Sequence, residues 1–206
     1  MKLFVLGATG PTGLEVVAQA LQAGHQVTAY VRNPGKVEAK GVRIVAGDAG
    51  SGTALERALP GHDAVVSALG RRASFASEHL ILRSMKALAP AMARCEVRRL
   101  VLVSAFGVGA SRRDAPLLPR IMYNLLLRDI FADKKAAEDY LRTTRLDWTF
   151  VYPVMLTDGP RTGQYRAGER LELKGMPKIS RADVADFILG ELRSPAYIRK
   201  TAVLSY

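Results

Sequence analysis

The segment Gly7-Ala8-Thr9-Gly10-Pro11-Thr12-Gly13 decides how this chain folds. Its three glycines follow the apolar run Lys2 to Leu6, which predicts a strand, and open a helical pattern over Thr12 to Ala23 that ends at Gly24. In such a turn the backbone can approach a pyrophosphate, which free N–H groups and the positive end of the helix dipole attract. A plain tight turn is the alternative. The strand, turn and helix in this order favour nucleotide binding, with contacts expected from Gly7, Thr9, Gly10, Pro11, Thr12 and Gly13.

Short apolar runs alternate with helical patterns along the rest of the chain. Ser180 is the expected N-cap of the last helix, and Asp183 follows three residues on, as in a capping box. Strands rich in Val and Leu, each followed by a helix, indicate an α/β fold with a doubly wound parallel sheet and helices on both faces. No linker divides the chain, so we expect one Rossmann-type domain over residues 1–206. Strands are predicted at 25–31, 42–46, 64–69, 100–104, 148–151 and 201–205, and helices at 53–59, 77–95, within 117–144 and at 180–192.

Composition excludes several other classes of protein. The 206 residues are 49% hydrophobic and 24% charged, which is typical of a globular rather than a disordered chain. The formal charge of +11 comes from scattered basic pairs without a basic tail, so nucleic-acid binding is disfavoured. No run approaches 18 apolar residues, Cys95 is the single cysteine, and the three histidines lack ligand spacing. We expect a cytoplasmic protein without a membrane segment, disulfide or metal site.

The residues after the second predicted strand indicate which dinucleotide binds. That strand ends in Tyr30-Val31-Arg32-Asn33-Pro34, with Lys36 nearby and no carboxylate. An acidic residue at this position binds the ribose of NAD, whereas an arginine accommodates the 2′-phosphate of NADP. We therefore expect NADP(H), held by Arg32 and Lys36. The alternative for Arg32 is an ordinary surface arginine.

Ligands of open α/β sheets bind outside the carboxyl ends of the strands, so the residues after each strand are candidate site residues. Asp48 is expected to accept a hydrogen bond from the adenine amino group, or else to be a turn residue. Tyr152 is expected to line the nicotinamide pocket, or else to be a core aromatic. Beyond the glycine turn and Arg32, the expected set is Asp48, Ala68, Leu69, Gly70, Ser104, Ala105, Phe106, Tyr152 and Pro153.

Several segments, in order along nearly the whole chain, resemble a known family. They are GATGPTG, V-R-N-P-x-K, G-D, DAVVSALG, LVLVSAFG, DKKAAEDYLR, LDWTFVYP and ISRADVA. Together they resemble the atypical short-chain dehydrogenase/reductases, and most closely the NmrA-like NAD(P)H-binding proteins that include the flavin/biliverdin-IXβ reductases. The resemblance implies a nicotinamide between the Ser104 and Pro153 segments, with Lys134 reaching toward its ribose. Lys134 and Ser104 are accordingly the expected catalytic residues.

One departure from the family's pattern bears on the reaction. Ile130 stands four residues before Lys134, and no tyrosine of the chain has a lysine four residues later, so a Tyr-x-x-x-Lys proton donor is absent. Hydride transfer would then suit an acceptor that delocalises charge, such as a flavin, quinone or tetrapyrrole. For Ser104 the alternative is a strand-end hydroxyl bonded to local backbone. For Lys134 it is a solvated helix face shared with Lys135 and Glu138.

Two functions are consistent with these residues. The first is an NADPH-dependent reductase of a small-molecule electron acceptor, whose specificity would come from loops at about 106–118 and 156–176. The turn-rich stretch Asp158 to Gly163 within the second loop could close over the site. The second is a sensor that binds NADP(H) without turnover, as regulatory members of the NmrA-like family do. The missing tyrosine favours the sensor, and the compact single domain favours the reductase.

Overall fold

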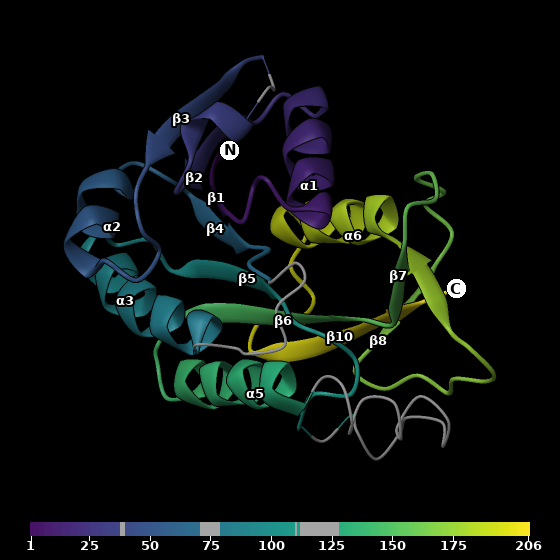
Figure 1. Ribbon diagram of the computed structural model, residues 1–206. Helices are drawn as coiled ribbons and strands as arrows, with labels where there is room; N and C mark the ends of the chain where they lie inside the picture. The colour runs from purple at the N-terminus through teal and green to yellow at the C-terminus, as the bar shows by residue number, and fades with distance from the viewer. Residues whose placement is uncertain (38–39, 71–78, 110, 112–127) are drawn as a thin grey trace.

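A computed structural model describes residues 1–37, 40–70, 79–109, 111 and 128–206, and it contains one central sheet of eight strands (Figure 1). The strand order is β3-β2-β1-β4-β5-β6-β10-β8, and every neighbouring pair is parallel except β10 and β8. The expected α/β fold with a doubly wound sheet is thereby confirmed. The strands of this sheet are β1 (Lys2–Leu6), β2 (Gln26–Val31), β3 (Val42–Ala46), β4 (Ala64–Ser67), β5 (Arg99–Val103), β6 (Asp147–Pro153), β8 (Arg166–Gly168) and β10 (Lys200–Ser205).

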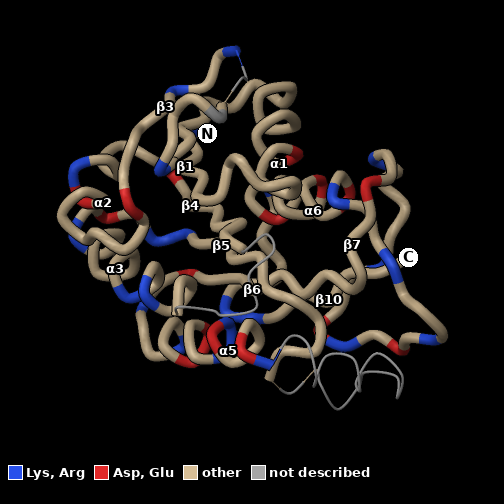
Figure 2. The backbone as a smooth tube through the Cα atoms, viewed as in Figure 1, with Lys and Arg blue, Asp and Glu red and all other residues tan. Residues whose placement is uncertain are grey.

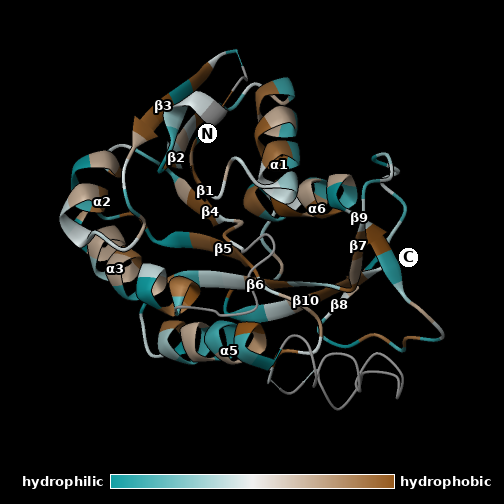
Figure 3. Ribbon diagram, viewed as in Figure 1, coloured by the Kyte–Doolittle hydropathy of each residue, from teal (hydrophilic) through white to brown (hydrophobic). Residues whose placement is uncertain are grey.

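Helices cover both faces of the sheet. Helix α1 packs on α6 at one face, and α3 packs between α2 and α5 at the other (Figure 1). The core lies between these layers, where strand residues such as Phe4, Leu102 and Phe150 are almost wholly buried. Figure 3 shows the same layering as hydrophobic strands in the centre of the molecule. The helices are α1 (Pro11–Gln22), α2 (Gly52–Ala58), α3 (Leu80–Arg94), α5 (Arg128–Arg142) and α6 (Arg181–Arg193), with a short 3-10 helix η1 (Pro34–Lys36).

Three short strands were not predicted. Strands β7 (Met155–Thr157) and β9 (Lys178–Ser180) pair in parallel as a second small sheet, and β8 adds an antiparallel edge to the main sheet. Each has three residues, too few to display a period-two pattern. The predicted helical residues 77–78 and 117–127, and residues 110 and 112–118 of the first predicted loop, lie outside the described residues.

The start of helix α6 is partly as predicted. Ser180 is its N-cap, and its side-chain oxygen accepts a hydrogen bond from the backbone N–H of Asp183 (2.9 Å). The return bond of a full capping box does not form, because the Ser180 N–H donates to the Tyr206 hydroxyl (3.2 Å) and the Asp183 carboxylate accepts from the N–H groups of Thr162 (2.8 Å) and Gly163 (2.9 Å). This carboxylate therefore anchors the turn-rich stretch after β7 to α6.

The lysines and arginines are not concentrated on any one of the described helices or strands. Figure 2 shows lysines and arginines on α2, α3, α5 and α6 as well as on strands and loops. Among the helices that the structure describes, none has the length and apolar character needed to cross a membrane.

Candidate functional site

The glycine turn has the geometry that a pyrophosphate requires. Gly7 has φ of +76°, and a Cβ at this position would lie 2.5 Å from the carbonyl oxygen of Ala68. A Cβ on Gly13 would lie 2.1 Å from the carbonyl oxygen of Gly7, so neither position accepts a side chain. Helix α1 begins with Pro11 after Gly10, and its first turn carries no acidic residue and no side-chain cap. Its positive end is therefore left for an anionic ligand.

The carboxyl ends of the central strands assemble the predicted residues into one edge. Ala68, after β4, donates its N–H to the carbonyl oxygen of Leu6 (2.9 Å), which places the segment 68–70 against the glycine turn. Phe106, after β5, donates its N–H to the carbonyl oxygen of Pro153 (3.0 Å) at the end of β6. The segments around 7–13, 68–70, 104–106 and 152–153 thus lie in the order of strands β1, β4, β5 and β6.

The residues predicted to select NADP(H) lie at the same edge, beyond β1. Arg32 directly follows β2 and is exposed to solvent. Gly47 donates its N–H to the carbonyl oxygen of Val31 (2.9 Å), so the ends of β2 and β3 adjoin. Asp48 is half exposed, and its Oδ1 accepts from the N–H of Gly50 (3.0 Å), which is the bond expected of a turn residue. Lys36 ends the short helix η1.

A buried polar cluster lies where β5 and β6 meet helix α5. Glu138 of α5 accepts a hydrogen bond from the Ser104 hydroxyl on Oε1 (2.5 Å) and another from the Tyr152 hydroxyl on Oε2. All three side chains are at most 5% exposed. We call Ser104, Glu138 and Tyr152 the buried triad. Both predicted residues, Ser104 and Tyr152, therefore meet at a carboxylate that the sequence did not single out.

Burial controls how the buried triad titrates. It raises the pKa of Glu138 above its usual value, although the hydrogen bonds from Ser104 and Tyr152 and the charges of Lys134 and Arg142 counteract this. Burial and the adjacent Glu138 also raise the pKa of Tyr152, so the phenol keeps its proton near neutral pH. The carboxyl of Glu138 is thus the member of the triad that can gain and lose a proton most readily.

Lys134 lies one helical turn before Glu138, on the inner side of α5. Its Nζ donates to the carbonyl oxygen of Val103 (3.3 Å), the last residue of β5. Burial lowers the pKa of Lys134 to about 8, against the opposing charges of Glu138 and Asp133. With this pKa, Lys134 is mostly charged at neutral pH, and the carbonyl group that it contacts belongs to the residue before Ser104.

Two alternatives for these residues are wrong. Glu138 is only 2% exposed and does not belong to a solvated helix face with Lys135. The exposed neighbour Lys135 instead pairs with Asp139 (2.5 Å), also half exposed. The Ser104 hydroxyl is bonded to Glu138 and not to local backbone. Lys134 and Glu138 are four residues apart, but the exposed pair Lys135 and Asp139 has the same spacing, so spacing alone does not signal the burial of Glu138.

Comparison with known proteins agrees with this fold. Bacillus subtilis YwnB, itself uncharacterized, is 33% identical over 96% of this chain and 94% of its own. A solved structure from Burkholderia pseudomallei matches over 100% of both chains with 31% identity and a TM-score of 0.85. Escherichia coli ChuY, described as an anaerobillin reductase, matches over 99% of this chain and 96% of its own, with 24% identity and a TM-score of 0.82.

A family model described as NAD(P)H-binding matches residues 7–195. The match begins at the first glycine of the turn and includes every predicted site residue, from Gly7 to Pro153. The match supports NAD(P)H as the ligand of this chain, and the open positive end of α1 remains the expected place for its pyrophosphate. The chain belongs to the NAD(P)H-binding family.

Proposed function

We propose that the protein is an NADP(H)-dependent oxidoreductase that passes hydride to a delocalised acceptor of the flavin, quinone or tetrapyrrole type. Membership of the NAD(P)H-binding family supports the dinucleotide, and the anaerobillin reductase ChuY supports a tetrapyrrole-like acceptor. The observation that carries the proposal is the buried triad at the carboxyl ends of β5 and β6. A buried carboxyl with a raised pKa is a common feature of catalytic sites, and dinucleotide binding alone does not require one.

Each residue of the site has a role in this proposal. The glycine turn and the first turn of α1 hold the pyrophosphate, and Arg32 with Lys36 holds the 2′-phosphate. Lys134 orients the nicotinamide ribose. The bound dinucleotide supplies a hydride, and the acceptor also needs one proton. Ser104 hydrogen-bonds the acceptor and passes it a proton that Glu138 replaces, while Tyr152 keeps the Glu138 carboxyl in position.

A sensor that binds NADP(H) without turnover is the second candidate. The observation that favours it is Ile130, which occupies the place of the tyrosine in a Tyr-x-x-x-Lys pair. The two candidates share the dinucleotide site and differ only in whether the buried triad works on an acceptor. Both fit a cytoplasmic protein with a small-molecule ligand and no nucleic-acid partner.

Steady-state oxidation of NADPH with FMN, FAD, dichlorophenolindophenol, quinones and biliverdin tests the proposal. We expect turnover with at least one acceptor, and Glu138→Gln should lower kcat by about 10²-fold or more, since general-acid catalysis contributes about 10²–10⁴-fold. The Kd for NADPH should not change. Glu172→Gln, at an exposed glutamate, is the matched control. Tight NADPH binding without turnover of any acceptor would establish the sensor instead.

A further inference from the structure

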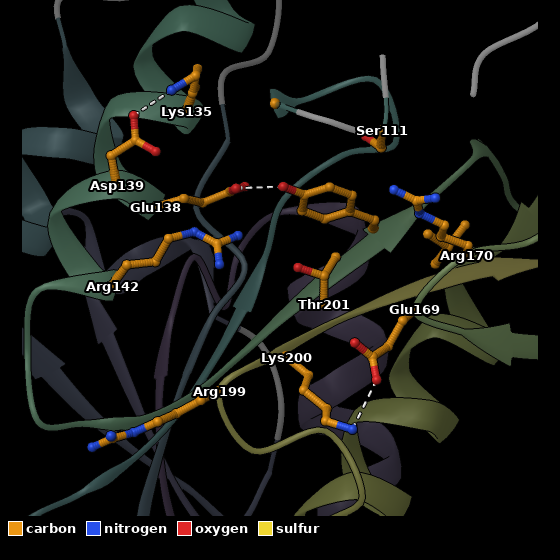
Figure 4. Close-up of a pocket in the computed structure, with 13 residues that line it drawn as sticks. Ser111, Lys135, Glu138, Asp139, Arg142, Glu169, Arg170, Arg199, Lys200 and Thr201 are labelled. Atoms are coloured by element: carbon orange, nitrogen blue, oxygen red, sulfur yellow. Dashed lines mark hydrogen bonds and ion pairs between the residues drawn. The ribbon is translucent and has the colours of Figure 1, made fainter. Parts of the chain in front are cut away.

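A large cavity lies beside helix α5, away from the glycine turn. It is about 910 Å³ in volume, within the range of small-molecule sites, and we call it the α5 groove. Its floor is formed by residues of β6 and β10, and its walls by α5, the loop after β5 and the residues that follow β8. The lining residues are Gly109, Ser111, Lys135, Glu138, Asp139, Arg142, Tyr152, Glu169, Arg170, Arg199, Lys200, Thr201 and Val203 (Figure 4).

Five basic and three acidic residues line the α5 groove, but the acidic ones are already engaged. Asp139 pairs with Lys135 (2.5 Å), and Glu169 pairs with Lys200 (2.8 Å). Glu138 accepts hydrogen bonds from the hydroxyls of the buried triad. Within the described part of the chain, no carboxylate forms a salt bridge with Arg142 or Arg170. Arg142 acts on Glu138 through its charge and on Tyr152 through a hydrogen bond, so the groove carries two guanidinium groups that lie outside any salt bridge among the described residues.

Arg142 and Arg170 come from different walls. Arg142 extends from α5 and Arg170 from the segment after β8, with Thr201 between them in Figure 4. The Arg142 guanidinium lies over the rings of Trp148 (5.0 Å) and Phe150 (5.1 Å), which fixes its position before any ligand arrives. Arg199 is not counted with these two arginines, because its guanidinium donates a hydrogen bond to the carbonyl oxygen of Arg145 (3.2 Å).

We propose that the α5 groove binds a small organic anion, whose carboxylate or phosphate group is attracted by the basic lining to which Arg142 and Arg170 contribute from opposite walls. A guanidinium presents paired donors that match both acidic groups, and the Thr201 hydroxyl adds a third donor beside them. The volume of the groove exceeds what an inorganic ion needs and leaves room for the organic body of a ligand. The proposed occupant is therefore an organic molecule with an acidic group.

The groove lies apart from the glycine turn and from Arg32, and the proposal does not rest on the proposed function. None of the turn residues from 7 to 13, nor Arg32, lines the α5 groove. The groove nevertheless touches the buried triad, because Glu138 and Tyr152 are part of its lining. A bound anion near Arg142 would offset the positive charge that this arginine directs at Glu138, and so the two sites share an electrostatic link.

The test uses three naphthalene probes on the full chain saturated with NADP⁺, so that the dinucleotide site is filled. 1-Naphthyl phosphate and 1-naphthoate carry the two acidic groups, and 1-naphthol is the neutral analogue. Titration followed by amide chemical shifts should place at least one acidic probe at Thr201, Val203 and Gly109. The acidic probe with the lower Kd shows whether the groove prefers a carboxylate or a phosphate group.

Arg142→Gln and Arg170→Gln should each weaken the better acidic probe about tenfold or more. Arg57→Gln, which removes the same charge from exposed α2, should leave its affinity unchanged. Arg170 is an exposed side chain, so its variant is expected to fold even if Arg142→Gln does not. Equal binding of 1-naphthol, shifts confined to other residues, no binding of either acid at about 10 mM, or affinities unchanged in Arg170→Gln would each overturn the proposal.

Discussion

Glu138 is a buried carboxyl at the wall of the α5 groove, and burial, opposed by hydrogen bonds and nearby charges, decides at which pH it ionises. Its two acceptor oxygens take the hydroxyl protons of Ser104 and Tyr152, and both bonds favour the charged form. Lys134 and Arg142 on the same helix favour the charged form as well, while burial favours the neutral one. Removing one hydroxyl therefore changes the pKa of Glu138 in a direction that can be stated in advance.

Tyr152→Phe should move the pH dependence of the proposed reaction. The phenol hydrogen bond lowers the pKa of Glu138, so its loss should raise that pKa further. If protonated Glu138 is the proton source, the rate declines as pH rises through its pKa, and in Tyr152→Phe this decline should occur at higher pH. The measurement is kcat against pH for the variant and the wild type.

Tyr140→Phe on the same helix is the control for the Tyr152 measurement, because Tyr140 lies outside the buried triad. Its pH profile should match the wild type. A Tyr152→Phe profile that keeps its shape and position and loses only amplitude would show that Tyr152 is a packing residue with no influence on Glu138 during turnover.

Helix α5 carries Lys134 and Glu138, and its position depends on a contact with α3. The N-cap residue of α3, His79, is in the left-handed region and makes no side-chain cap bond. The cap is supplied instead from α5, where the buried Asp133 carboxylate accepts from the N–H groups of Ile81 (2.9 Å) and Leu82 (3.0 Å). One carboxylate thus satisfies the start of α3 and fixes α5 against it.

Asp133→Ala should destabilise the fold by about 2–3 kcal/mol, because two buried N–H groups lose a charged partner. Asp133→Asn, which keeps an acceptor oxygen, should cost less. Urea unfolding followed by circular dichroism measures both. Asp129→Ala, at an exposed position in the first turn of α5, should change stability by at most about 1 kcal/mol. If Asp133→Ala and Asp129→Ala lowered the free energy of unfolding by similar amounts, the Asp133 cap of α3 would contribute little to stability.

The sequence predicts the central sheet of the molecule because each strand leaves a local pattern. Lys2 to Leu6 and Val42 to Ala46 are predicted with the bounds that the structure gives, and the other central strands differ by one or two residues at an end. The carboxyl-edge residues could be predicted for the same reason, since parallel strands place their ends on one edge. Strands β7, β8 and β9 could not, because their pairing depends on partners distant in sequence.

Glu138 could not be identified from local charges alone. Lys135 and Glu138 look alike as charged residues three apart on an amphipathic helix, and only the packing of α5 against β5 and β6 decides which of them is buried. The α5 groove is even harder to predict from sequence than the burial of Glu138, because its lining residues come from α5, β6, β10 and the segment after β8. Burial and cavities of this kind are properties of the assembled layers and not of any one segment.

Dinucleotide binding should stabilise the whole molecule by mass action. A ligand at 100 times its Kd adds about 2.7 kcal/mol to the free energy of unfolding. For a chain of 206 residues this corresponds to an increase in Tm of about 5–10 °C. If Arg32 holds the 2′-phosphate, NADH should bind about 10–100-fold more weakly and give at most about half that increase at the same concentration.

Arg32→Gln should reduce the increase in Tm with NADPH to the increase seen with NADH, whereas Arg57→Gln should leave the increase with NADPH unchanged. Thermal unfolding with each dinucleotide measures these shifts, and equal shifts with NADH and NADPH in the wild type would refute the role of Arg32.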